Sequence, residues 1–258
     1  MGSKNKLKRF KENETFNNVF QPTREEVVGD LFPLRGKWNS DFFKNENPLV
    51  LELGCGKGEY SIGLASLYPN QNLIGIDVKG NRIWVGAKKA LELNLANVAF
   101  IRSQIGMIDG YFEKDEVAEI WLPFPDPQLR ISKSTKRLTH PIFLRKYKQI
   151  LKSDGYINLK TDSPTLYAFT KLVIEMYGLT ILVDSDDIHR DLSDNQDLQI
   201  KTHYEGLDIA ESKKVHFLKF MLDGELEIEK DDLLADEVRR LETGSKEGRE
   251  NHEKEETD

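Results

Sequence analysis

The stretch that most constrains the fold is Leu-Glu-Leu-Gly-Cys-Gly-Lys-Gly-Glu, residues 51–59. An apolar run that ends in an acid and three alternate glycines, followed by a helical pattern, predicts a strand, a tight loop and a helix. Gly54, Gly56 and Gly58 allow positive φ and let the backbone approach a ligand that a Cβ would block. In doubly wound α/β sheets ligands bind here, beyond the carboxyl ends of the strands.

The spacing of these glycines distinguishes between two classes of ligand-binding loop. Dinucleotide-binding loops have Gly-x-Gly-x-x-Gly and receive a pyrophosphate at a helix N-terminus, whereas this loop is Gly-x-Gly-x-Gly with Glu52 just upstream. An anion beside the ligand suits a cation better than a diphosphate. The loop resembles the first motif of class I methyltransferases, which bind S-adenosylmethionine, a sulfonium and ammonium compound. A glycine-rich turn without a ligand remains the alternative on this motif alone.

The rest of the chain continues the alternation of strands and helices. Asp77 ends the second strand, where a carboxylate can accept hydrogen bonds from both ribose hydroxyls of an adenosine. Gln104 follows the third strand and is either an adenine contact or a solvated loop residue. The last strand follows its predecessor without a crossover helix, which predicts antiparallel pairing. We therefore expect an α/β, Rossmann-like sheet of seven strands, the last one antiparallel, as in class I methyltransferases. The predicted strands are 48–53, 72–77, 98–102, 118–122, 156–159, 179–183 and 213–221, and the predicted helices are 59–67, 80–93, 141–151 and 165–177.

Two aspartates follow predicted strands further along the chain. Asp126 lies in Pro-Phe-Pro-Asp-Pro, residues 123–127, where the prolines fix φ and bias each preceding residue to extended geometry. We expect this carboxylate to be held rigidly beside the ligand, the alternative being a proline-rich corner. Asp162 also lies at a carboxyl strand end, although Ser163 and Pro164 behind it make a helix N-cap an equally good interpretation.

Charge is unevenly distributed along the chain. The net charge is -7 over 258 residues, but residues 222–258 alone contain 15 acids and 6 bases, which leaves the preceding part slightly positive. Such segregation can supply a phosphate-binding face on a protein that is acidic overall, with solvated helix faces as the alternative. Within residues 128–153 there are eight bases and no acid: Arg130, Lys133, Lys136, Arg137, Arg145, Lys146, Lys148 and Lys152.

Several classes of protein are disfavoured by the sequence. No apolar stretch approaches the roughly 20 residues that span a bilayer, and the single cysteine cannot form an internal disulfide, so we expect a cytoplasmic protein. The five histidines show no ligand spacing, and the aspartate-rich residues 184–197 lack the glycine and glutamate of a calcium loop; we expect no metal. We expect a mobile basic arm over 1–21, a methyltransferase domain over 22–222 and an acidic tail over 223–258 that consists of a frayed helix and disorder. Both a monomer and a homodimer remain open.

Four separated motifs resemble one family, the bacterial tRNA (guanine-N(7)-)-methyltransferases, over roughly residues 48–220. They are residues 51–58, Phe124-Pro-Asp-Pro with the later Lys136-Arg137-Leu138, Lys160-Thr161-Asp162, and Thr202-His-Tyr-Glu205. The resemblance implies methyl transfer from S-adenosylmethionine to N7 of the variable-loop guanine of tRNA. It implies catalysis by Asp126, cofactor contacts by Glu52, Gly54, Gly56, Gly58, Asp77, Gln104 and Asp126, and substrate contacts by Arg130, Asp162, Thr202, His203, Tyr204 and Glu205. Gln128 stands where the family usually has tryptophan, and Arg130 where it has lysine.

Two other functions compete with this one. A methyltransferase that acts on another RNA or on a small molecule would share the glycine loop, but would leave the Phe-Pro-Asp-Pro motif and the acid-free basic segment unexplained. A non-catalytic RNA-binding protein with an unused cofactor pocket would show no affinity for S-adenosylmethionine.

Overall fold

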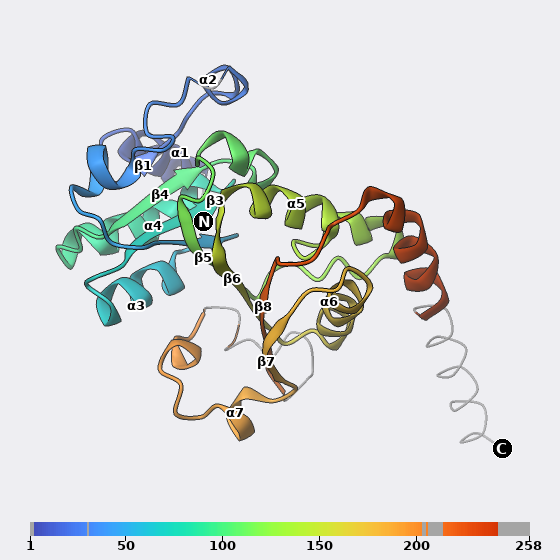
Figure 1. Cartoon of the computed structure of the whole chain (residues 1–258). Coiled ribbons are helices and arrows are strands. Elements are labelled where there is room, and N and C mark those ends of the chain that lie inside the picture. The colour runs from blue at the N-terminus through green and yellow to red at the C-terminus, as the bar shows by residue number, and fades with distance from the viewer. Residues whose placement is uncertain (1–2, 30, 203–204, 206–213, 242–258) are drawn as a thin grey trace.

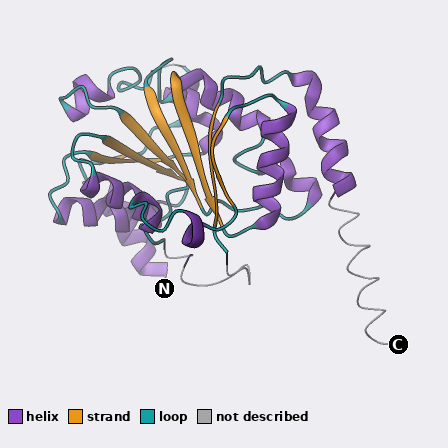
Figure 2. Cartoon of the chain, turned by 60° about the horizontal axis from the view of Figure 1, so that its bottom comes forward, coloured by secondary structure: helices purple, strands orange, loops and turns teal. Residues whose placement is uncertain are grey.

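The computed structural model describes residues 3–29, 31–202, 205 and 214–241. A sheet of eight strands in the order β1-β4-β3-β2-β5-β6-β8-β7 runs through the molecule, with helices on both of its faces (Figures 1 and 2). The strands are β1 (Val19–Phe20), β2 (Leu49–Leu53), β3 (Asn72–Asp77), β4 (Val98–Arg102), β5 (Val117–Pro123), β6 (Leu151–Thr161), β7 (Ile181–Ser185) and β8 (His216–Met221). The α-helices are α1 (Ser3–Asn13), α2 (Arg24–Val28), α3 (Glu59–Leu67), α4 (Gly80–Glu92), α5 (Pro141–Ile150), α6 (Pro164–Met176) and α7 (Ile188–Asp191), with a further helix over 231–241.

Short helical turns lie between these elements. They are the π-helical turn η1 (Trp38–Phe43) and the 3₁₀ turns η2 (Ile105–Gly110), η3 (Ile131–Lys136), η4 (Asp197–Gln199) and η6 (Ile228–Lys230).

The sheet reverses its strand order at β2, which is where a ligand crevice is expected. β2 pairs in parallel with β3 on one side and with β5 on the other. Every residue of β2 and β3 is buried, as befits central strands covered by helices on both faces. The carboxyl ends of β2, β3, β4, β5 and β6 therefore meet at one edge, and the loops that leave them converge on the crevice.

The predicted architecture is confirmed, with one additional strand. β8 pairs antiparallel with both β6 and β7, as the sequence predicted. The sheet has eight strands rather than seven because Val19 and Phe20 pair in parallel with Phe100 and Ile101 of β4. A strand of two residues is too short to give a recognisable period in the sequence.

The N-terminal segment, which the sequence predicted to be a mobile arm, forms helix α1 from residue 3 and contacts the rest of the protein. The amide of Asn13 donates to the carbonyl of Gly80 at 2.8 Å, and that of Asn18 donates to Ala87 at 3.1 Å. The Arg9 guanidinium lies 4.3 Å from the centre of the Trp84 ring. These polar and cation–π contacts fix α1 on α4, and the apolar content of the segment alone gave no sign of them.

The beginning of the acidic tail is also ordered. Asp231 accepts two hydrogen bonds from Arg145 of α5, at 2.9 and 2.5 Å, and one from the Tyr177 hydroxyl at 2.6 Å. Leu234 and Val238 of the helix over 231–241 are buried in the main apolar core. Residues 231–241 thus form a helix that packs on the body of the protein, and residues 242–258 lie outside the described part. None of the helices in the described part is both long and apolar enough to span a membrane.

Candidate active site

The glycine loop forms a cradle at the carboxyl end of β2. Gly54, Gly56 and Gly58 all have positive φ, at +76°, +55° and +71°. A Cβ on Gly54 would meet no atom within 4 Å and one on Gly56 only a carbonyl oxygen at 4.0 Å, whereas one on Gly58 would lie 2.5 Å from the Phe100 ring. The first two glycines thus leave open space in front of the loop, and the third permits close packing of the loop on the sheet.

Two carboxylates support this loop from within the protein. Asp77 accepts a hydrogen bond from the Gly56 amide at 2.9 Å and another from the Lys79 amide at 2.7 Å, so it joins the end of β3 to the cradle. Glu52 is buried and accepts from both the amide and the hydroxyl of Ser61 in α3, at 2.7 and 2.5 Å. Burial raises the pKa of Glu52 to about 8, and a bound cation nearby would favour its ionised form.

A cavity of about 650 Å³ opens beside the cradle, at the carboxyl ends of β3 and β4. Gln104 is exposed on its wall, at the residue before η2. The opposite wall comes from the N-terminal segment, which the sequence analysis did not assign to the site. A Thr23–Glu26 capping box fixes the start of α2 there, and Thr-x-x-Glu is a sequence signal of a helix start. The lining residues are Gln21, Pro22, Arg24, Val28, Val78, Arg102, Ser103, Gln104 and Met107.

The proline loop places Asp126 on the surface at the end of β5. The Asp126 carboxylate accepts a hydrogen bond from the Gln128 amide at 3.0 Å, and Phe124 and Gln128 have positive φ of 48° and 47°. Arg137, which is fully buried, donates to the carbonyls of Pro127 at 3.1 Å and Gln128 at 3.3 Å. Side-chain and backbone hydrogen bonds, as well as the prolines, thus fix the loop.

Arg137 was predicted as part of a phosphate-binding face, and its burial corrects that assignment. Its guanidinium lies 4.5 Å from the centre of the Phe169 ring. Three further bases of the same run face acids of this chain: Arg145 binds Asp231, Lys146 binds Asp109 and Lys148 lies near Glu225. The exposed bases that follow the Asp126 loop are Arg130, Lys133 and Lys136, which we call the basic triad.

Glu205 of the last predicted motif, residues 202–205, contacts the end of β6. The Lys160 ammonium binds the Glu205 carboxylate at 3.0 Å, and the Glu205 amide donates to the Thr202 hydroxyl at 3.2 Å. Asp162 is half-buried beside this pair, and the N-cap of α6 is Ser163 rather than Asp162. His203 and Tyr204 lie outside the described residues. Lys160 belongs to the Lys160-Thr161-Asp162 motif, but its sequence position alone did not indicate a role for it.

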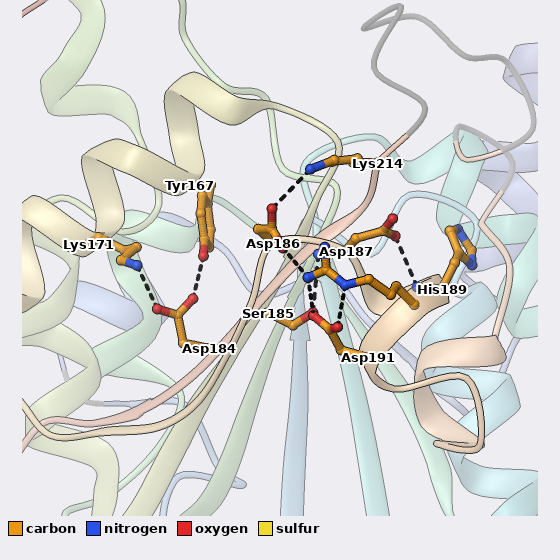
Figure 3. Close-up of polar contacts among 10 residues, drawn as sticks. Tyr167, Lys171, Asp184, Ser185, Asp186, Asp187, His189, Asp191 and Lys214 are labelled. Atoms are coloured by element: carbon orange, nitrogen blue, oxygen red, sulfur yellow. Dashed lines mark hydrogen bonds and ion pairs between the residues drawn. The ribbon is translucent and has the colours of Figure 1, made fainter.

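The aspartate-rich segment after β7 is neutralised by bases (Figure 3). Asp184 binds Lys171 at 2.6 Å, Asp186 binds Lys214 at 3.0 Å, and Asp191 binds Arg190 at 2.6 Å. Asp187 caps the short α7. Within the described residues no group of three or more histidine, cysteine, aspartate or glutamate side chains is arranged to hold a metal ion.

The sheet order, the glycine cradle and the acid after β5 define a Rossmann-like methyltransferase. The fold aligns with the 16S rRNA methyltransferase KamB at a TM-score of 0.52 and 12% identity, covering 70% of this chain and 90% of that one. A family model described as "Putative methyltransferase" matches residues 46–218.

Related proteins show which methyltransferase family this is. The chain is 49% identical to a tRNA (guanine-N(7)-)-methyltransferase of Christiangramia forsetii, over 86% of this chain and all of that protein. It is 43% identical to one of Bacteroides fragilis, over 89% of this chain and 90% of that protein. The chain belongs to the tRNA (guanine-N(7)-)-methyltransferase family.

Proposed function

We propose that this protein transfers the methyl group of S-adenosylmethionine to N7 of the variable-loop guanine of tRNA. The observation that carries the proposal is the pairing of two loops at the β2–β5 junction. The glycine cradle leaves β2, the Asp126 loop leaves β5, and the two strands are hydrogen-bonded neighbours. A donor in the cradle and an acceptor at Asp126 would therefore be adjacent.

The cofactor assignment rests on the fit of the cradle. The open space in front of Gly54 and Gly56 accommodates a ligand in contact with the backbone. Asp77 presents a carboxylate beside it for ribose hydroxyls, and Gln104 lies on the wall of the neighbouring cavity. Glu52 is buried below the loop with a raised pKa, and a cationic ligand bound nearby would favour its ionised form, which in turn would attract that ligand. S-adenosylmethionine, when bound, supplies an activated methyl group on a sulfonium.

The reaction places limited chemical demands on the protein. Guanine N7 carries a lone pair and no proton, so its attack on the methyl carbon needs no general base. Catalysis then depends on alignment and on complementary charge. The exposed Asp126 carboxylate, fixed by Gln128 and Arg137, would stabilise the positive charge that develops on the guanine ring or accept its N–H groups.

The basic triad would hold the tRNA backbone. Arg130, Lys133 and Lys136 are exposed on and just before η3, which directly follows the Asp126 loop. N7 lies in the deep, narrow groove of paired RNA, which side chains cannot read. The target guanine must therefore lie in a loop or leave its helix, while phosphate contacts keep the tRNA in register.

The test is nucleoside analysis of unmodified tRNA after incubation with the protein and methyl-labelled S-adenosylmethionine. We expect labelled 7-methylguanosine at the variable loop. Absence of this product from every tRNA tried, in a protein that binds the cofactor by calorimetry, would refute the proposed reaction.

A further inference from the structure

Lys160 is a buried cation whose ammonium, within the described part of the chain, donates its hydrogen bonds to one segment. Its side chain is 0% exposed. The ammonium donates to the carbonyl of Leu198 at 2.8 Å, to the carbonyl of Ile200 at 3.2 Å and to the carboxylate of Glu205 at 3.0 Å. Lysine has three N–H donors, so one side chain at the end of β6 holds residues 198 and 200 together with Glu205 of the C-terminal motif.

The same lysine is joined to the loop that carries Asp126. Its backbone carbonyl accepts a hydrogen bond from the Phe124 amide at 2.7 Å, and its ammonium lies 5.2 Å from the centre of the Phe124 ring. On the cofactor side, the Tyr60 ring of α3 lies 5.5 Å from the ammonium. Lys160 therefore contacts three parts of the site: the helix behind the glycine cradle, the Asp126 loop and the C-terminal motif.

The hydrogen bonds that Glu205 receives from described side-chain and backbone groups go to one of its two carboxylate oxygens. Oε2 accepts from the Lys160 ammonium at 3.0 Å and from the Thr202 amide at 3.4 Å. No hydrogen bond to Oε1 occurs among the residues that the structure describes. Burial lowers the pKa of Lys160, and the nearby Glu205 carboxylate opposes this shift. Removal of one partner of a buried ion pair leaves the other charge uncompensated.

We propose that Lys160 is a positioning residue for the methyl-transfer reaction: it fixes Glu205 through Oε2, so that Oε1 is held ready to accept a hydrogen bond from the target guanine. This inference rests on the proposed function and specifies how the substrate base is aligned. Lys160 itself touches neither reactant. Its role is to hold the C-terminal motif at a constant position relative to Asp126.

The test compares Lys160→Met with the control Lys171→Met. Lys171 also binds an aspartate, but at the surface, where its side chain is 43% exposed. For Lys160→Met we expect kcat to fall about 100-fold, because a displacement of about 1 Å has that effect on a positioned reaction, while the Kd for S-adenosylmethionine changes less than about threefold. Hydrogen exchange of the amides of residues 198–202 should become faster. The control should match the wild type in all three measurements.

A second variant separates misfolding from misalignment. Lys160→Met with Glu205→Gln removes both charges, so it should recover the melting temperature lost in the single variant without recovering kcat. Recovery of kcat in the double variant, or wild-type kcat and exchange in Lys160→Met, would overturn the inference. Hydrogen exchange needs no tRNA. Faster exchange in a protein that methylates no tRNA would therefore refute the proposed function and leave the anchoring by Lys160 standing.

Discussion

The two sides of the ligand crevice hold their loops by different means. On the cofactor side, the amides of Gly54 and Cys55 donate to the carbonyl of Ile76 at 2.8 and 3.0 Å, and Asp77 accepts from Gly56. On the proposed substrate side, the buried cation Arg137 holds the loop of Asp126. The buried cation Lys160 holds Leu198, Ile200 and Glu205. The position of a loop that is hydrogen-bonded to the adjacent strand depends on backbone conformation. The position of a loop that is bound by a cation from elsewhere in the chain depends on that one side chain.

The largest effect is expected from Asp126→Ala on the substrate side. Loss of a charge that we propose faces the reacting base should lower kcat about 100- to 1000-fold, with the Kd for S-adenosylmethionine within about threefold of the wild-type value. Steady-state kinetics and calorimetry measure the two quantities. Asp126→Asn is the matched control for the loop, because its amide oxygen can still accept from the Gln128 amide. Normal turnover of Asp126→Ala would remove this residue from the proposed mechanism.

Arg137→Met tests whether one cation maintains the Asp126 loop. Two hydrogen bonds to loop carbonyls are lost, and we expect kcat to fall about 10- to 100-fold because the carboxylate is displaced. Arg145→Met is the control, since Arg145 is also partly buried and binds Asp231 away from the site. Both variants should unfold at lower temperature, but only the first should lose kcat. Equal losses of kcat in the two variants would contradict the assigned role of Arg137.

The basic triad can be separated from the bases that are paired within the chain. Arg130→Gln, Lys133→Gln and Lys136→Gln combined should weaken tRNA binding and reduce the slope of log K against log salt by about 2 to 3, since each phosphate contact contributes about 0.7 to 0.9. Lys146→Gln with Lys148→Gln should leave that slope unchanged. Filter binding over a range of salt concentrations measures it. If the salt slope fell equally in both variants, the basic triad would not be the specific binding site for the tRNA phosphates.

The smallest effect is expected on the cofactor side, from Gly54→Ala compared with Gly178→Ala. Both glycines have positive φ, at +76° and +63°, and open space around the missing Cβ. Each substitution should therefore cost about 1 to 2 kcal/mol of folding free energy. Only Gly54→Ala should also weaken S-adenosylmethionine binding, by about tenfold, which corresponds to about 1.4 kcal/mol. If calorimetry gave the same Kd for S-adenosylmethionine in both variants, the cofactor would not bind against Gly54.

The same contrast explains how much of the site the sequence could predict. The β2–α3 unit, Asp77 at the end of β3 and Asp126 after β5 were all predicted at their positions along the fold, because each depends on residues close together in the chain. The burial of Arg137 was not predicted. A base in a run of bases resembles a solvated face, and only the packing of α6 shows that Phe169 covers it.

Two other features escaped prediction for the same reason. The ordering of the N-terminal segment depends on contacts with α4 and β4 that are far away in the sequence, such as the hydrogen bond from Asn18 to Ala87. Lys160 lay within a quoted motif, but its three acceptors lie 38 to 45 residues further along the chain. Local patterns indicate strands, helices and turns, and they do not show which charged side chains become buried.

Because the helix over 231–241 is attached to α5, the protein chain cannot be shortened to residue 222 without loss of contacts. Ending the chain at residue 222, to remove its acidic end, would uncover the core where Leu234 and Val238 now pack and deprive the Arg145 guanidinium of its carboxylate partner. A fusion partner or affinity handle at the C-terminal end is compatible with the described structure when it is joined after residue 241. The acidic C-terminal region thus includes residues, up to 241, that pack on the folded domain.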